Sequence, residues 1–206
     1  MKRQGWLGTS ALVSSFLHQH CRTMRMSRFF WAVLLLTAVA SCGAAKEDNQ
    51  MNDSTTVAQF TMSSQDIKDG QPIAQVYTCD GADRSPQLSW GDPPAGTKSL
   101  ALVMDDPDAP SGLFRHWGAY DIPATTREIA GGQAIGTQAA NDFGKSGYGG
   151  PCPPKGHGPH HYRFKLYALD VERLELPANA KVEQVEAEAL KHEIGIAQLT
   201  GTYERK

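Results

Sequence analysis

Two separated segments rich in proline and glycine constrain the fold of this chain more than any other feature. The first, residues 105–110, reads Asp-Asp-Pro-Asp-Ala-Pro and is followed closely by His116. The second, residues 149–162, holds Cys152 between prolines and also contains three histidines. Proline fixes the backbone φ angle and removes a donor, so such stretches form rigid loops rather than regular elements. Because each segment adjoins a strand-like run, we expect two loops that converge on one polar pocket.

The apolar runs beside these loops predict β-strands. Residues 100–104 are continuously apolar, as expected of a strand that is buried on both faces. Residues 117–122 are a second predicted strand, and residues 162–169 alternate between two faces. Proline and glycine clusters between these runs indicate long connections. One face of the alternating strand carries Tyr162, Phe164, Leu166 and Ala168, and the other carries Arg163, Lys165 and Tyr167.

One segment late in the chain has the periodicity of a helix. It is expected to begin after Asn179 as the N-cap and to stop at Gly195. A single helix that lies on sheets predicts an all-β sandwich with helical decoration. The apolar positions at helical spacing are Val182, Val185, Ala189 and Leu190.

The N-terminal part of the sequence has the pattern of an export signal. Arg25 and Arg28 precede an apolar run, residues 29–40, that is too short to span a bilayer comfortably. The small residues that follow lead into Cys42, and residues 39–42 resemble the bacterial lipobox. The lipobox cysteine is diacylated, and two acyl chains hold a protein stably on a membrane. We expect a lipoprotein of the bacterial cell envelope that faces the periplasm; an ordinary signal peptide is the alternative.

The chain divides into four parts by these criteria. Translation is expected to start at Met24 or Met26, so residues 1–23 are a mis-assigned start or an extension, and residues 24–41 are the signal peptide. Residues 42–56 are polar and aperiodic, as in a flexible tether, and residues 57–206 form the folded domain. Beyond Ser41 the chain has 15 basic and 22 acidic residues, a net charge of −7. This acidic balance disfavours nucleic acid as a partner.

The two loops hold four of the seven histidines in the chain. Imidazoles and open backbone N–H groups are suited to bind a phosphate or a carboxylate. A metal site built from the same histidines and Asp106 is disfavoured, because no familiar zinc spacing is present. A plain strand-end turn, in which the aspartates bond local N–H groups, is the structural alternative for the acidic loop. The histidines concerned are His116, His157, His160 and His161.

The cysteines provide a further constraint. Once Cys21 is removed and Cys42 is lipidated, Cys79 and Cys152 remain, an even count in an oxidising compartment. We therefore predict a Cys79–Cys152 disulfide that ties a second loop to the histidine segment. A nucleophilic pair of Cys152 with His116 or His160 is the alternative.

The ordered motifs closely resemble those of the phosphatidylethanolamine-binding protein family, in the bacterial branch related to Raf kinase inhibitor protein. The resemblance extends over nearly the whole domain. The matching segments are 69–70, 77–81, 85–90, 106–110, 116–117, 141–144, 148–156, 160, 162, 167–170 and 199–203.

This resemblance implies an antiparallel β-sandwich with a small anion-binding pocket at one end. It also implies a cis bond between Ala109 and Pro110. The family usually has arginine where this chain has His161, which puts in doubt a salt bridge to Asp108, and proline where it has Ala74. The ligand-binding residues that it implies are Asp106, Asp108, His116, Gly150, Cys152, Pro153, Pro154, His160 and Tyr162.

A carboxylate in an anion pocket needs an explanation, since like charges repel. Either Asp106 accepts a hydrogen bond from His116, or it is protonated when the anion binds. We expect a lipid-anchored binding protein for small anionic head groups, without cofactor, metal or catalysis. The alternatives are an inhibitor of a protease or kinase-like protein target and a weak phosphoester hydrolase that uses Asp106 and the histidines.

Overall fold

The structure is a computed structural model that describes residues 60–206. The predicted signal peptide, the predicted lipidation site Cys42, the predicted tether and the predicted domain start at residue 57 lie outside the described residues. In the described part, no helix is long and apolar enough to cross a membrane.

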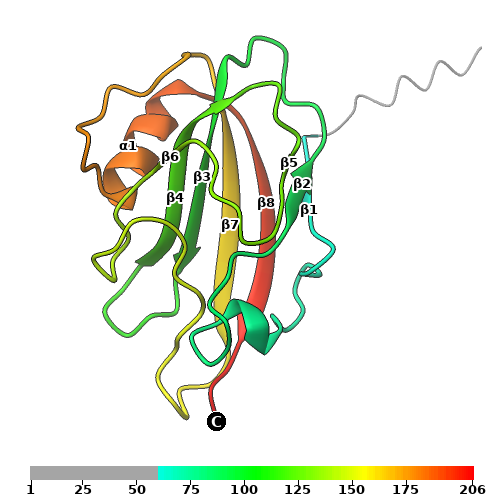
Figure 1. The fold of residues 1–206 in the computed structure, drawn as a ribbon, viewed down its shortest axis with the longest axis vertical. Helices are drawn as coiled ribbons and strands as arrows, with labels where there is room; N and C mark the ends of the chain where they lie inside the picture. The colour runs from blue at the N-terminus through cyan, green and yellow to red at the C-terminus, as the bar shows by residue number, and fades with distance from the viewer. Residues whose placement is uncertain (1–59) are drawn as a thin grey trace, which may run out of the picture. The chain divides into compact units, whose positions relative to one another are not determined.

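Two antiparallel sheets and one α-helix make up the described part of this domain (Figure 1). The small sheet has the order β1-β2-β5, and the large sheet has the order β6-β4-β3-β7-β8. A short 3-10 helix, η1, precedes β2. The bounds are β1 Met62–Ser63, η1 Gln75–Tyr77, β2 Leu88–Trp90, β3 Ser99–Asp106, β4 Phe114–Pro123, β5 Glu128–Ile129, β6 Thr137–Gln138, β7 His160–Leu169, α1 Val182–His192 and β8 Glu193–Tyr203.

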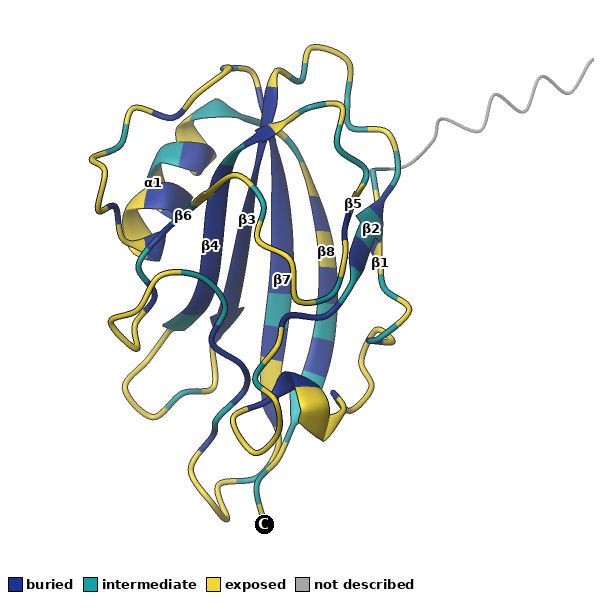
Figure 2. Cartoon of the chain, in the orientation of Figure 1, coloured by how far each residue is buried: buried dark blue, intermediate teal, exposed yellow. Residues whose placement is uncertain are grey.

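The three predicted strands are β3, β4 and β7 of the large sheet. All eight residues of β3 are buried, because this strand lies between β4 and β7 and both of its faces are covered (Figure 2). The alternation predicted for β7 is also present. Tyr162, Phe164, Leu166 and Ala168 belong to the core between the two sheets, and Tyr167 belongs to a second core beneath α1.

The face of the large sheet beneath α1 also holds a buried ion network. Asp105, at the end of β3, pairs with Arg163 Nε at 2.7 Å and with Lys165 Nζ at 2.6 Å. Lys165 also bonds Glu186 of α1. Because side chains alternate along a strand, Asp105 and Asp106 face opposite ways, and only Asp106 is available to the polar pocket.

Both predicted ends of the helix were wrong. The N-cap is Lys181, whose backbone N–H donates to the Gln184 side chain. A turn from Pro177 to Ala180 places Asn179 before the helix. The helix ends at His192 and β8 begins at the next residue. Gly195 lies within β8, where a Cβ would stand 2.6 Å from Pro94, so packing rather than helix termination explains this glycine.

Candidate functional site

The candidate site lies where three strands of the large sheet meet. β3 runs antiparallel to both β4 and β7, so its last residues lie beside the first residues of these neighbours. Asp106 is thereby placed opposite Phe114, and His116 and His160 follow near the starts of β4 and β7. The predicted convergence of the two loops is therefore present in the structure.

The loops enclose a cavity of about 260 Å³, which we call the histidine cavity. Its polar groups are Asp106, His116, His160 and Ser111, and the other lining residues are apolar or belong to the disulfide. Those residues are Ala109, Pro110, Phe114, Phe143, Cys152, Pro153 and Pro154.

A second cavity of about 320 Å³, the lysine cavity, lies next to the first. The two share Phe143 and Cys152 as walls. The remaining lining residues of the lysine cavity are Cys79, Asp83, Lys145 and Gly150.

The predicted site residues fall into two groups. Six of them line the histidine cavity: Asp106, His116, Cys152, Pro153, Pro154 and His160. The other three do not. Gly150 lines the lysine cavity, and Asp108 bonds His161 outside the histidine cavity. The Tyr162 ring packs edge-on against the His116 ring, with 5.2 Å between the ring centroids.

Phe114 and Phe143 were missed as cavity walls. Phe114 stands two residues before His116 in a strand and therefore shares its face, a signal that the sequence does contain. Phe143 lies in a loop, and nothing in its sequence spacing indicates that it reaches the cavity.

One of the two explanations for Asp106, a hydrogen bond from His116, was wrong. Its Oδ2 accepts a hydrogen bond from His160 Nδ1 at 2.8 Å, and its Oδ1 accepts the backbone N–H of Asp108 at 2.8 Å. The chain of contacts continues from His160 Nε2 to His157 Nδ1 at 3.0 Å. Both carboxylate oxygens are thus engaged within the protein, and the histidine that bonds the carboxylate is His160 rather than His116.

His116 is held separately, by the second loop. Its Nδ1 donates to the Gly149 carbonyl oxygen at 2.8 Å, which fixes the tautomer and leaves Nε2 as the second ring nitrogen. Burial lowers the pKa of this imidazole, against the smaller opposing effect of the Gly149 contact. The ring is therefore neutral near pH 7 and can bind a proton when a negative charge approaches.

Tyr162 contributes a buried hydroxyl to the same region. The oxygen has no hydrogen-bond partner in the structure. Burial, and then the nearby Asp106 carboxylate, raise the pKa of this phenol far above its ordinary value. Tyr162 therefore stays a hydrogen-bond donor over the whole physiological range.

His161 takes the place expected of the family arginine. Its backbone N–H and its Nδ1 both lie 2.8 Å from Asp108 Oδ2. These bonds hold the pKa of Asp108 below its ordinary value. His161 thus makes the contact with Asp108 that the absence of the family arginine had put in doubt.

The cis bond expected between Ala109 and Pro110 was wrong. The described residues contain no cis peptide bond. Gly112 N–H bonds the Ala109 carbonyl at 2.9 Å, which closes a turn with Pro110 at its second position. A trans proline suits that position.

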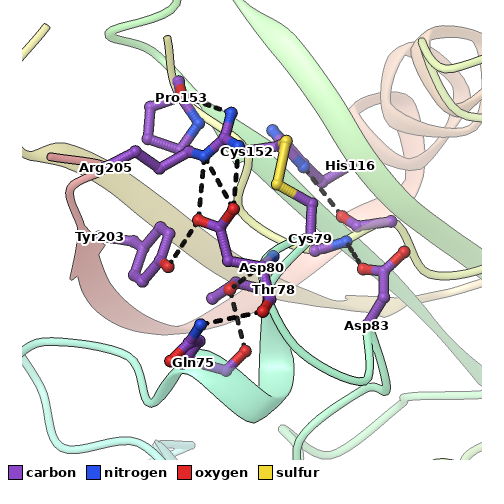
Figure 3. Close-up of a disulfide and its surroundings, with 12 residues drawn as sticks. Gln75, Thr78, Cys79, Asp80, Asp83, His116, Cys152, Pro153, Tyr203 and Arg205 are labelled. Atoms are coloured by element: carbon purple, nitrogen blue, oxygen red, sulfur yellow. Dashed lines mark hydrogen bonds and ion pairs between the residues drawn. A yellow bond between two sulfur atoms is a disulfide. The ribbon is translucent and has the colours of Figure 1, made fainter. Parts of the chain in front are cut away.

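Cys79 and Cys152 form the predicted disulfide, which is shown with its surroundings in Figure 3. Three further contacts bind the same two loops. Cys79 N–H bonds the Pro151 carbonyl at 3.1 Å, Gly150 N–H bonds Asp83 Oδ1 at 2.6 Å, and Arg205 bonds both Asp80 and the Pro153 carbonyl. The alternative nucleophilic role of Cys152 is incompatible with this bond. Within residues 60–206, no group of three His, Cys, Asp or Glu side chains is arranged to hold a metal ion.

Comparisons with known proteins agree with this geometry. The family model described as phosphatidylethanolamine-binding protein matches residues 63–204. A UPF0098 protein of Aquifex aeolicus is 50% identical over 148 residues, which are 69% of this chain and 86% of that protein. A Mycobacterium tuberculosis protein whose provisional name is lipoprotein LppC is 40% identical over 186 residues, or 82% of this chain and 92% of its own length.

A solved structure shows the same fold. The crystal structure of YbcL from E. coli, described as a new member of the mammalian PEBP family, superposes with a TM-score of 0.68 at 37% identity. The match covers 72% of this chain and 100% of YbcL. On the family model, the relatives and the fold together, the chain belongs to the phosphatidylethanolamine-binding protein family.

Proposed function

We propose that the protein binds a small anionic group, a phosphate ester or a carboxylate, in the histidine cavity. The observation that carries this proposal is His116, a buried imidazole that lines the cavity while its Nδ1 is held by Gly149. The ring is set to offer Nε2 to a ligand, and its position is fixed before the ligand arrives. Preorganised polar groups in a mainly apolar cavity are typical of small-molecule sites.

Binding is favoured over hydrolysis by the state of Asp106. Both oxygens of this carboxylate accept hydrogen bonds at 2.8 Å, so each has one lone pair fewer to offer a substrate or a water molecule. We therefore expect no turnover of phosphoesters.

The proposal predicts that anion binding is linked to proton uptake. The pKa of His116 is lowered in the free protein, and a bound anion raises it because an opposite charge stabilises the imidazolium. Affinity should then rise as the pH falls, by up to about tenfold per pH unit for one proton, and level off below the pKa of the free protein.

Calorimetry between pH 5 and 8 tests this linkage. Sulfate is a suitable probe because its charge is constant over that range, and phosphoethanolamine serves as the phosphate ester. His116→Ala should weaken binding about tenfold or more and reduce the pH dependence. The matched control is His192→Ala, since His192 pairs with Asp170 and does not line the cavity. An affinity for sulfate that does not change with pH would refute the linkage.

We also propose that the protein is held at the bacterial envelope, facing the periplasm, by lipid on Cys42. The lipobox pattern at residues 39–42 and the name of the LppC relative support this anchor. Cys42→Ser should move the protein from the membrane fraction to the soluble fraction. Mass spectrometry of the mature N-terminal peptide checks the result directly, and an unmodified Cys42 in the native protein would contradict it.

A further inference from the structure

The histidine cavity lacks a permanent positive charge, but the cavity beside it has one. No lysine or arginine is among the residues that line the histidine cavity. Lys145 lines the lysine cavity, and the two cavities share Phe143 and Cys152 as walls. A cation is therefore placed one aromatic ring away from the proposed anion site.

The Phe143 ring relates the two groups geometrically. The ring of His116 lies edge-on to it with centroids 5.2 Å apart, and the ammonium of Lys145 lies 5.7 Å from the same centroid. Phe143 itself is exposed, with 44% of its surface accessible. A ligand that reaches past the exposed ring from His116 thus meets Lys145.

Lys145 is only loosely engaged by the protein. Its Nζ lies 3.3 Å from Asp83 Oδ2, and the lysine side chain is 53% exposed. The other oxygen of Asp83 accepts the Gly150 N–H at 2.6 Å, so this aspartate has a structural role that does not depend on the lysine. An exposed ion pair of this kind contributes little, and a ligand carboxylate can compete with Asp83 for the ammonium.

We infer that Lys145 forms a second anion subsite, and that the preferred ligand carries two anionic groups. One group, a phosphate or a carboxylate, occupies the histidine cavity, and a carboxylate on the same small molecule pairs with Lys145. This inference rests on the proposed function, because it needs the first group to be bound at His116.

Two substitutions can test anion binding by Lys145 without disrupting the loop that carries it. The loop is held by the backbone of Lys145, whose N–H bonds Asn141 Oδ1 and whose carbonyl accepts the Asn141 N–H. Lys145→Gln therefore keeps the loop while it removes the charge, with its ion pair to Asp83 and its contact with the Phe143 ring. Asp83 has a positive φ of 51°, a conformation that asparagine tolerates. Asp83→Asn therefore keeps the turn and an oxygen for Gly150 while it removes the competitor of the ligand.

The test compares phosphoserine with phosphoethanolamine, which differ by one carboxylate, in calorimetry at pH 7. The protein should bind phosphoserine about 3- to 10-fold more tightly, and this preference should shrink as salt screens the exposed charge. Lys145→Gln should abolish the preference and leave phosphoethanolamine affinity within about 2-fold. Asp83→Asn should raise phosphoserine affinity about 2- to 3-fold, a gain that misfolding does not produce.

The control variant is Lys98→Gln, which removes one exposed positive charge that lines neither cavity. The second subsite would be overturned if Lys145→Gln lowered the affinity for phosphoserine and for phosphoethanolamine equally. It would also be overturned if Lys98→Gln reduced the preference for phosphoserine as much as Lys145→Gln does, because either result would show a general effect of charge. If phosphoethanolamine binds but phosphoserine is not preferred, the second subsite fails while the proposed function stands. If neither probe nor sulfate binds, the proposed function itself fails.

Discussion

A carboxylate can line a proposed anion pocket when its oxygens already accept hydrogen bonds within the protein. Asp106 is only 3% exposed, and its two oxygens are occupied by the Asp108 N–H and by His160 Nδ1. His160 is in turn in contact with the exposed His157. The aspartate therefore has a structural role at the cavity, because it fixes His160 and the turn that closes one side of the cavity.

Substitutions of Asp106 should separate the roles of its two oxygens. Asp106→Ala leaves the Asp108 N–H and His160 Nδ1 without partners, so the free energy of unfolding should fall by about 2–3 kcal/mol. Asp106→Asn should lose less than about 1 kcal/mol, since the amide oxygen can accept from Asp108 and its NH₂ can donate to a His160 of the other tautomer. Urea unfolding measures both values, and equal losses would contradict this account of the pair.

At the scale of secondary structure, the long patterned elements were predictable and the others were not. The continuous apolar run of β3 and the alternation of β7 identified these strands and the faces of their side chains. β8 has eleven residues but was not predicted as a strand. Its two glycines, Gly195 and Gly201, make room for Pro94 and Ile73, and so they interrupt the alternation that marks a strand.

The shortest strands leave no signal for a different reason. β1, β5 and β6 have two residues each, which is too few for any periodicity, and they form only because longer neighbours offer a partner. The helix was found from its apolar positions, but its cap was not. Lys181 is not a usual N-cap residue, and it caps through the Gln184 side chain rather than through its own.

The candidate site shows the same division between pattern and packing. The proline and glycine composition identified both loops, and the antiparallel order of β4, β3 and β7 brings them together. The partner of Asp106 could not be predicted from spacing, because β3 has a histidine-bearing neighbour on each side. The direction of each side chain decides between His116 and His160, and that direction depends on register and bulges, such as the shift between Met104 and Asp105.

At the scale of the whole described domain, the wall of both cavities depends on segments far apart in the sequence. Cys152 lines the two cavities and is bonded to Cys79, 73 residues earlier. The C-terminal Arg205 bonds Asp80 and the Pro153 carbonyl, so the same loop is also tied to the end of the chain. These long-range contacts make the cavity wall part of the domain rather than a free surface loop.

Removal of the disulfide tests how much of this wall depends on one covalent bond. The double variant Cys79→Ala, Cys152→Ala should lower the free energy of unfolding by about 2–4 kcal/mol, since a cross-link over a long loop restricts the unfolded chain. The variant should still fold and bind sulfate, with an affinity lowered by less than about tenfold. The reason is that the hydrogen bonds from Cys79 to Pro151 and from Gly150 to Asp83 do not involve the sulfur atoms.

Urea unfolding of the wild type with and without reductant provides the comparison, because the reduced wild type should match the double variant. A wild type whose stability is insensitive to reductant, with free thiols confirmed by mass, would contradict a stabilising role for this bond.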